Sequence, residues 1–333
     1  MRCFAGFFRF SSLKTSSVLI LLSAVLLFTS IHTLHPQENG IPPTVVSPML
    51  FFFALCIICM LIGIFAVLGG VGGGVIFTPL MMGFTSIDSY IIRTTGLFIA
   101  MAGALIAARP YLRKGIANIR LLMLTALPNV LFSIIGAFLA VYIHSSMGET
   151  GEALIRGILG VFVIGISILF ICTRKRTEYP ETGTVDAFSK CLCLDMSYRE
   201  DSVGEKVSYR VKRTLPGILC ICLIGLTSGL FGLGAGWAIV PVFNLVMLVP
   251  LKAAAACSTV MISLGGTAAV WPYILNGGMF PILVVPCLIG MTAGAHIGSK
   301  IMMKSKPSFI RYIIIIVLLC AGIRLCTKAF SMG

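Results

Sequence analysis

A glycine-rich stretch that occurs twice constrains this chain more than any other feature of its sequence. Residues 69–74 read Gly-Gly-Val-Gly-Gly-Gly and lead to Pro79, and residues 231–236 read Phe-Gly-Leu-Gly-Ala-Gly and lead to Pro241. The second stretch follows the first at an offset of 162 residues. A glycine inside a helix costs about 1 kcal/mol relative to alanine. We therefore expect an interrupted helix at both places.

The same offset relates identical residues well beyond the glycines. The matched pairs include Gly103 and Gly265, Pro110 and Pro272, Tyr111 and Tyr273, Gly115 and Gly277, and Gly136 and Gly298. One register that persists over this length predicts two homologous halves. We divide the chain into a signal peptide or signal-anchor segment (1–45), a first transmembrane repeat (46–173), a charged cytoplasmic linker (174–213) and a second transmembrane repeat (214–333).

The composition is that of an integral membrane protein. Hydrophobic residues make up 58% of the chain and charged residues 11%, and the mean hydropathy is +1.05. Seven of the eleven acidic residues lie in residues 174–213, so the remainder is almost free of carboxylates. The net charge of +14 does not indicate nucleic-acid binding, because the basic residues gather at the ends of apolar segments. The predicted location is the plasma membrane or an endomembrane.

Each half contains five apolar segments, and the second of them is short. Fifteen residues at 1.5 Å per residue span about 22 Å, less than the ~30 Å hydrocarbon core. The loop at 109–120 carries four basic residues and its counterpart at 271–279 carries none, so the two halves are expected to face opposite sides of the membrane. The predicted fold is an all-α membrane protein of two inverted-topology repeats, with short broken helices after the glycine-rich stretches. The segments are about 47–68, 72–86, 88–109, 118–143 and 153–173, then 214–231, 235–249, 251–275, 279–303 and 308–326.

The segments on either side of the first repeat, residues 1–45 and 174–213, contain no part of the repeated sequence. Basic residues precede an apolar run at 16–31, which is typical of a signal peptide and also of a short first transmembrane helix. Residues 174–213 hold nine basic and seven acidic residues, and we interpret them as a flexible cytoplasmic linker.

The glycine stretches are the first candidates for a binding site. Interrupted backbone at membrane depth is tolerated where it is buried in protein or lines a watery cavity. A helix that starts there directs free N–H groups at the cavity, which favours an anion. The alternative is close helix packing at small residues. The residues assigned to the site are Gly72, Gly73, Gly74, Pro79, Gly234, Gly236 and Pro241.

These stretches, with the helices that follow them, resemble the TauE/SafE sulfite exporter family. Its repeats open with a glycine-rich run that ends in proline, followed by a helix with small and hydroxyl residues; here those helices carry Thr94-Thr95 and Cys257-Ser258-Thr259. The resemblance covers about residues 50–330. It implies a multipass permease for small anions such as sulfite, sulfonates and related sulfur-containing compounds. The implied partners are this small anionic substrate and the lipid bilayer, and a homo-oligomer is left open.

Polar side chains in the apolar segments complete the candidate site. The hydroxyls of Thr94, Thr95, Ser258 and Thr259 can donate to an anion, or each can bond to its own helix backbone four residues earlier. His296 is the one histidine deep in an apolar segment, and it can carry a proton, contact the anion or hydrogen-bond between helices. Arg93 can extend outward to the membrane surface or draw anions inward, and we favour the first of these. Since no Asp or Glu lies inside a predicted span, no proton relay through carboxylates is expected.

Two other functions stay open. Cys56 and Cys59 form a C-x-x-C, which would suit a membrane thiol–disulfide carrier, although two small residues on one helix face explain the spacing as well. A non-transporting scaffold would instead depend on the linker. The sequence contains no nucleotide-binding motif, catalytic triad or zinc-spaced cluster, so we predict no enzyme, no catalytic residue, no metal site and no cofactor.

Overall fold

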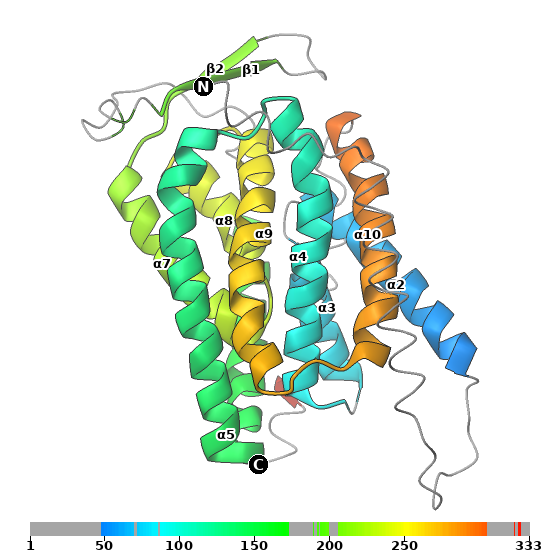
Figure 1. Ribbon diagram of the computed structural model, residues 1–333. Helices are drawn as coiled ribbons and strands as arrows, with labels where there is room; N and C mark the ends of the chain where they lie inside the picture. Colours follow the sequence, from blue (N-terminus) through cyan, green and yellow to red (C-terminus); the bar gives the residue numbers. More distant parts are fainter. Residues whose placement is uncertain are drawn as a thin grey trace, which may run out of the picture.

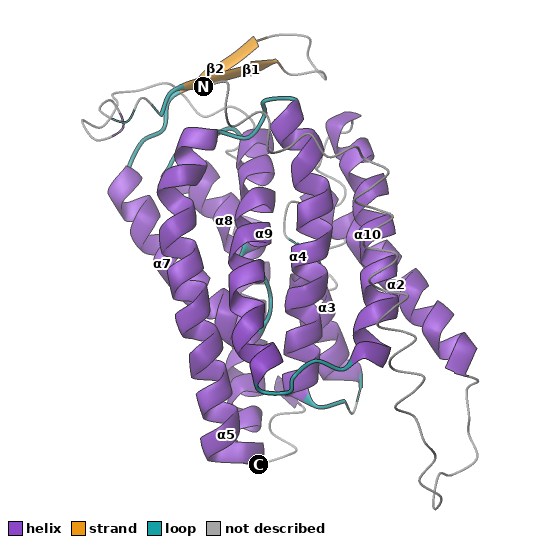
Figure 2. Ribbon diagram, viewed as in Figure 1, coloured by secondary structure: helices purple, strands orange, loops and turns teal. Residues whose placement is uncertain are grey.

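The structure is a computed structural model in which a bundle of helices carries one small β-hairpin (Figures 1 and 2). It describes residues 48–69, 72–85, 87–172, 194–199 and 206–304, and the single residues 189, 192, 323, 326 and 327. The predicted segment 1–45 and nearly all of the segment 308–326 lie outside the described residues. The helices are α2 (Pro48–Gly69), α3 (Gly73–Phe84), α4 (Ser89–Arg113), α5 (Ile119–Cys172), α7 (Thr214–Phe231), α8 (Gly236–Pro241), the π-helical turn η2 (Val242–Val246), α9 (Leu251–Leu275) and α10 (Pro281–Lys304).

In the part of the chain that the structure describes, five helices are long and apolar enough to cross a membrane. They are α4, the part of α5 from Ile119 to Gly148, α7, α9 and Pro281–Ile301 of α10. The helix α3 has 12 residues, which span about 18 Å and do not reach across the hydrocarbon core. The prediction of an all-α membrane protein is therefore confirmed, and the segments after the glycine stretches are short as expected.

The elements of the two halves recur at the offset found in the sequence. The helices α4 and α9 both have 25 residues, and their first residues, Ser89 and Leu251, are 162 positions apart. Gly115 and Gly277, which follow them, both adopt positive φ values, of 64° and 75°. In Figure 1, α4 and α9 lie side by side and run in opposite directions. Inverted halves would have this arrangement, while the side of the membrane that each half faces stays a prediction.

The helix α5 contains two of the predicted segments in one element of 54 residues. Its backbone breaks at Gly148, where φ is 50° and ψ is −129°, outside the helical region. A residue with a Cβ rarely adopts this φ, so glycine allows the chain to change direction there. The break carries the residues after it, including Glu152, back toward the bundle, where Glu152 is buried.

Two helix pairs, α5 with α7 and α10 with α2, are in contact through residues that are related by the offset of 162. A Cβ atom on Gly136 of α5 would lie 2.0 Å from the carbonyl oxygen of Leu226 in α7, and one on Gly298 of α10 would lie 2.9 Å from that of Ile64 in α2. Gly136 and Gly298 are equivalent in the repeat, and so are Leu226 and Ile64. Each half therefore packs one of its helices against the other half in the same way, with glycine permitting the close approach.

The linker contains a β-hairpin that the sequence did not predict. Strands β1 (Met196–Arg199) and β2 (Lys206–Tyr209) pair antiparallel, with Tyr198 opposite Val207. Tyr198 and Tyr209 are buried, and their rings lie 6.3 Å apart. The Asn118 side-chain amide, just after α4, donates to the Leu194 carbonyl at 2.9 Å. This part of the linker is therefore held against the helices because alternate side chains of the hairpin find apolar surface there.

Candidate functional site

The helical backbone is interrupted at both glycine stretches, as the sequence predicts. Gly72 precedes α3 with φ 85°. Gly232 ends α7 with φ 67°, and Gly234 precedes α8 with φ 74°. These values lie in the left-handed region, which glycine adopts without a steric penalty. The helices on each side of the stretches are consequently separate elements.

The two interruptions touch each other. A Cβ atom on Gly74 would lie 2.5 Å from the carbonyl oxygen of Leu233, and one on Gly96 of α4 would lie 2.7 Å from that of Gly232. The Thr78 hydroxyl donates a hydrogen bond to the Gly232 carbonyl at 3.0 Å. All residues from 72 to 79 and from 231 to 241 are buried, including Pro79 and Pro241. The structure therefore brings the predicted glycine residues together, in close contact of backbone with backbone.

The contacts of this centre repeat across the two halves. A Cβ atom on Gly72 would lie 3.0 Å from Ile262 of α9, and one on Gly234 would lie 3.1 Å from Ala100 of α4. Ala100 and Ile262 are equivalent in the repeat, as are Gly72 and Gly234. The centre is thus lined by the same positions from both halves.

The predicted hydroxyl residues are buried in α4 and α9, and the threonines among them bond to their own helices. Thr94 donates to Tyr90 at 2.9 Å and Thr95 to Ile91 at 2.8 Å, in both cases to the backbone carbonyl. Thr259 donates to the Ala255 carbonyl at 2.8 Å, and Ser258 is fully buried. The three threonine hydroxyls have thus given their hydrogen to the backbone, and each would have to rotate before it could donate to an anion.

His296 is placed differently from the other candidates. Its side chain is exposed on α10, whereas its neighbours Gly294 and Ala295 are buried. The structure therefore does not bring His296 to the glycine centre. Asn129, another polar residue in an apolar helix, is buried in α5, and its side-chain amide donates to the Met261 carbonyl at 3.3 Å.

Arg93 lies in a different place from the one that the sequence indicated. Its side chain is fully buried in α4, so the expectation that it extends to the membrane surface was wrong. The guanidinium forms an ion pair with Glu152, also buried, and donates to the carbonyl of Leu230 at 3.4 Å. Its backbone packs against the second glycine stretch, since a Cβ atom on Gly232 would lie 2.5 Å from the Arg93 carbonyl oxygen. A buried guanidinium needs a counter-ion. Since few carboxylates lie outside the linker, a search among them for a partner of Arg93 could have identified Glu152 from the sequence.

Glu152 connects Arg93 to a histidine and a tyrosine. The His144 Nδ1 atom lies 2.9 Å from the same carboxylate oxygen that faces Arg93. The His144 ring stacks on that of Tyr90, with centroids 4.3 Å apart, and the Arg93 Cζ atom lies 5.7 Å from the Tyr90 ring centre. We call Tyr90, Arg93, His144 and Glu152 the Arg93 cluster. It joins the start of α4 to the two parts of α5 around Gly148.

Cys56 and Cys59 lie in the contact between α2 and α10. The Cys56 thiol donates to the Pro286 carbonyl at 3.2 Å, and a Cβ atom on Gly290 would lie 2.1 Å from the Cys56 carbonyl oxygen. Cys59 is fully buried. Both residues act as small helix-packing residues here, which agrees with the structural explanation of the C-x-x-C spacing.

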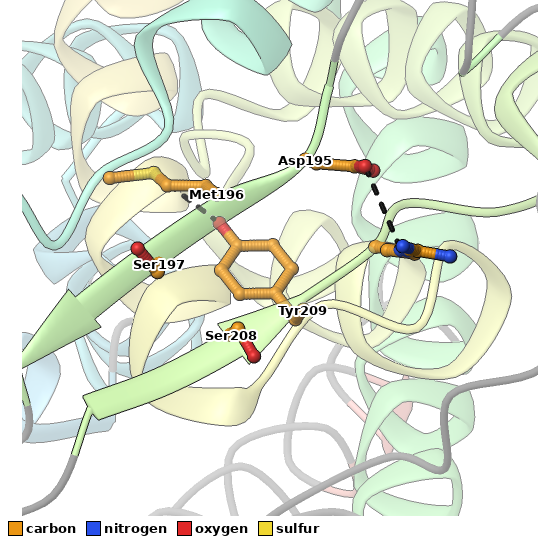
Figure 3. A pocket seen from close by; sticks show the side chains of 6 residues that line it. Asp195, Met196, Ser197, Ser208 and Tyr209 are labelled. Atoms are coloured by element: carbon orange, nitrogen blue, oxygen red, sulfur yellow. Dashed lines mark hydrogen bonds and ion pairs between the residues drawn. The ribbon is translucent and has the colours of Figure 1, made fainter.

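A hollow of about 340 Å³ lies on the hairpin, apart from the glycine centre (Figure 3). Figure 3 shows the Tyr209 hydroxyl directed at the Met196 sulfur, 3.7 Å away. Burial raises the pKa of Tyr209. None of the predicted site residues lines this hollow. Its lining residues are Asp195, Met196, Ser197, Ser208, Tyr209 and Arg210.

Comparison with known proteins decides the family. The model of the family described as sulfite exporter TauE/SafE matches residues 55–325, which include both glycine stretches and the Arg93 cluster. The chain belongs to the TauE/SafE family. It is an integral membrane transporter, and the resemblance that the glycine stretches indicated is confirmed.

Two curated relatives of this TauE/SafE protein are described as probable membrane transporters. The protein YunE of Bacillus subtilis is 23% identical over 283 residues, which cover 82% of this chain and 97% of that protein. The protein MJ0441 of Methanocaldococcus jannaschii is 25% identical over 272 residues, which cover 77% and 88%. No solved structure matches the chain.

Proposed function

We propose that the protein transports small anions across the membrane, and that its substrates are sulfite, sulfonates or related sulfur-containing organic anions. The observation that carries this proposal is Arg93, whose backbone packs against Gly232 of the second glycine stretch and whose guanidinium is buried in an ion pair with Glu152. A guanidinium held at this place can bind an anion when its pair with Glu152 opens. The family description, which names sulfite, supports the choice of sulfur oxyanions.

The proposed mechanism is alternating access between two inverted halves. The short helices α3 and α8 begin at the glycine centre, where the halves meet through the small residues Gly74, Gly96 and Gly232. Small residues allow packed backbones to move past each other with few side-chain obstacles. A rocking motion of one half against the other would expose the centre first to one side of the membrane and then to the other.

The proposed substrate contacts come from both halves. Backbone amides at Gly72, Gly73, Gly74, Gly234 and Gly236 and the hydroxyls of Thr94, Thr95, Ser258 and Thr259 would hold the anion once the centre opens. This opening is required because these residues are buried and the threonine hydroxyls are bonded to their helices. His296 is not included, since it is exposed on α10.

Flux into proteoliposomes tests this function. The full chain is reconstituted, and uptake of labelled sulfite, sulfate, thiosulfate and taurine is compared with uptake into protein-free liposomes. We expect at least one sulfur-containing anion to accumulate faster with the protein, and unlabelled sulfite to compete with it. Uptake equal to that of protein-free liposomes for every anion, from protein that is monodisperse before reconstitution, would contradict the proposal.

A further inference from the structure

Arg93 is held by one acidic partner. Among the described residues, Glu152 is the carboxylate within ion-pair distance of the Arg93 guanidinium, and the two side chains are 10% and 0% exposed. The other acceptors of Arg93 are backbone carbonyls, of Ser89 and Leu230, both at 3.4 Å. A buried charge that loses its partner is strongly unfavourable. Whatever separates Arg93 from Glu152 must therefore supply a new partner to each of them.

The cluster has unused hydrogen-bonding capacity at the place where such partners would bind. The Glu152 Oε1 atom faces both Arg93 and His144, while its Oε2 atom is buried with no partner among the described residues. The Tyr90 hydroxyl is buried and unpartnered as well. Buried polar atoms are normally hydrogen-bonded, so an exception calls for an explanation. An anion bound beside them could accept hydrogen bonds from the Tyr90 hydroxyl and from a protonated Glu152, which would remove both exceptions.

We propose that Arg93 is a binding site for a small oxyanion with one negative charge, and that this anion binds together with one proton, which Glu152 takes up. The anion replaces the Glu152 carboxylate on Arg93. The released carboxylate is buried without a counter-charge, so it binds a proton and becomes neutral. The net charge of the site is zero before and after the exchange. This inference rests on the proposed anion transport and assigns its coupling ion.

His144 connects Glu152 to the surface. Its side chain is 35% exposed, its Nδ1 atom lies 2.9 Å from Glu152, and its ring is fixed by stacking on Tyr90. An imidazole in this position can pass a proton from solution to the carboxylate. Three other charged or titratable groups lie around the cluster among the described residues. Asp88 caps α4 by accepting from Tyr90 N–H, Arg156 donates to the Ser89 hydroxyl, and the Tyr273 hydroxyl donates to the Gly229 carbonyl.

Replacement of Glu152 by an anion on Arg93 would also affect the glycine centre. The Arg93 guanidinium donates to the Leu230 carbonyl at the end of α7, and the Arg93 backbone lies against Gly232, two residues further on. A rearrangement of Arg93 on anion binding thus acts on the segment where α7 ends and the second glycine stretch begins. The site is therefore placed to link anion and proton binding to the movement of the halves.

Calorimetric titration of the full chain in nanodiscs tests the inference. The probe anion is methanesulfonate, and taurine, whose sulfonate is balanced by its own ammonium group, is the zwitterionic comparison. Methanesulfonate stays ionised throughout, so any proton taken up with it belongs to the protein. Binding is measured between about pH 5 and 8, in buffers of different ionisation enthalpy, which give the number of protons bound. For wild type we expect one proton per methanesulfonate and an affinity that falls by up to about tenfold per pH unit as the pH rises.

Two variants and a control separate the role of Glu152 in proton uptake from the role of Arg93 in anion binding. Glu152→Gln keeps the size of the side chain and resembles its protonated form, so methanesulfonate binding should remain while its pH dependence and proton uptake disappear. Arg93→Gln should lose binding at least about tenfold, because the anion loses its charged partner. Asp195→Asn, in the exposed pair with Arg210, should match wild type.

The outcomes distinguish this inference from the proposed function. If wild type binds neither methanesulfonate, taurine nor sulfite at any pH and shows no flux, the proposed anion transport fails. If wild type binds an anion without proton uptake, or if Glu152→Gln retains the wild-type pH dependence, the coupling through Glu152 is overturned while anion transport stands. The wild-type proton count decides the question even if a variant does not fold.

Discussion

The Thr78 hydroxyl donates a hydrogen bond to the carbonyl of Gly232, 3.0 Å away. The two residues are 154 positions apart, and the bond joins the short helix of the first half to the glycine stretch of the second. Both residues are buried. The two interruptions are therefore connected directly, which makes the glycine centre a single unit for the experiments below.

Replacing Thr78 by valine should destabilise this connection. Thr78→Val keeps the shape of the side chain and leaves the buried Gly232 carbonyl without its donor, which costs about 1–3 kcal/mol. Thermal unfolding in detergent should show a lower midpoint. Thr227→Val is the control, because the Thr227 hydroxyl bonds only to carbonyls of its own helix, at 3.0 Å. Equal shifts for the two variants would contradict a specific role of the Thr78 bond.

Gly232→Ala should lower the stability of the protein much more than Gly115→Ala. Both residues have positive φ, 67° and 64°, so each substitution carries a similar backbone strain of about 1–2 kcal/mol. A Cβ atom on Gly232 would also lie 2.5 Å from the Arg93 carbonyl oxygen, whereas one on Gly115 meets nothing within 4 Å. We expect Gly232→Ala to lose a further ~1–3 kcal/mol in unfolding experiments, together with anion flux. Similar stability of the two variants would show that the close approach at Gly232 is not needed.

The buried pair of Arg93 and Glu152 should behave as one unit. Arg93→Leu leaves the buried Glu152 without its charged partner, with only the His144 ring beside it, and is expected to cost about 3–5 kcal/mol. The double variant Arg93→Leu with Glu152→Leu should be more stable than Arg93→Leu alone, because no charge remains buried. Thermal unfolding of all four proteins completes the cycle. Additive effects in this cycle would contradict the pairing.

The exposed pair of Asp195 and Arg210 provides the comparison. Its atoms are 3.7 Å apart and its side chains are 56% and 58% exposed. Arg210→Leu is therefore expected to change stability by less than about 1 kcal/mol. A loss as large as that of Arg93→Leu would mean that burial does not explain the importance of the Arg93 cluster.

Removing the thiols of Cys56 and Cys59 should leave anion flux intact. Both residues pack in the contact of α2 with α10, so alanine preserves a small side chain at each position. Flux of the double variant Cys56→Ala with Cys59→Ala is compared with that of wild type in proteoliposomes. Loss of activity in the folded double variant would favour the thiol–disulfide carrier over the permease.

Asn118 should control how the hairpin is held. Its side-chain amide donates to the Leu194 carbonyl at 2.9 Å, and its backbone N–H donates to the Cys257 thiol at 3.2 Å. Asn118→Ala removes the first bond, together with the bond that Asn118 Oδ1 accepts from Leu121 N–H at 3.2 Å. We therefore expect faster proteolysis in the linker by a factor of about 5 or more, for a loss near 1 kcal/mol. Ser208→Ala, at an exposed hairpin position, is the control. Equal cleavage rates would contradict the role of Asn118.

The order of the described membrane segments, and the ends of several of them, could be predicted from the sequence alone. Apolar runs, glycine interruptions and the repeat are local or periodic properties, and they placed α4 and α9 within a few residues of their observed ends. The resemblance to the TauE/SafE family rested on the same glycine stretches, and the family model that matches residues 55–325 confirms it. The positive φ of Gly72, Gly232 and Gly234 also agrees with the interruptions expected there.

Only the tertiary structure decided which polar residues share a site. Helices in a membrane are apolar on the sides facing lipid and protein alike, so periodicity does not tell which face is buried. Arg93 was expected at the membrane surface and lies fully buried, because its partner Glu152 comes from 59 residues away. His296 was expected inside and lies exposed. A charge inside a membrane protein is stable only beside its partner, and that partner is set by the packing of distant segments.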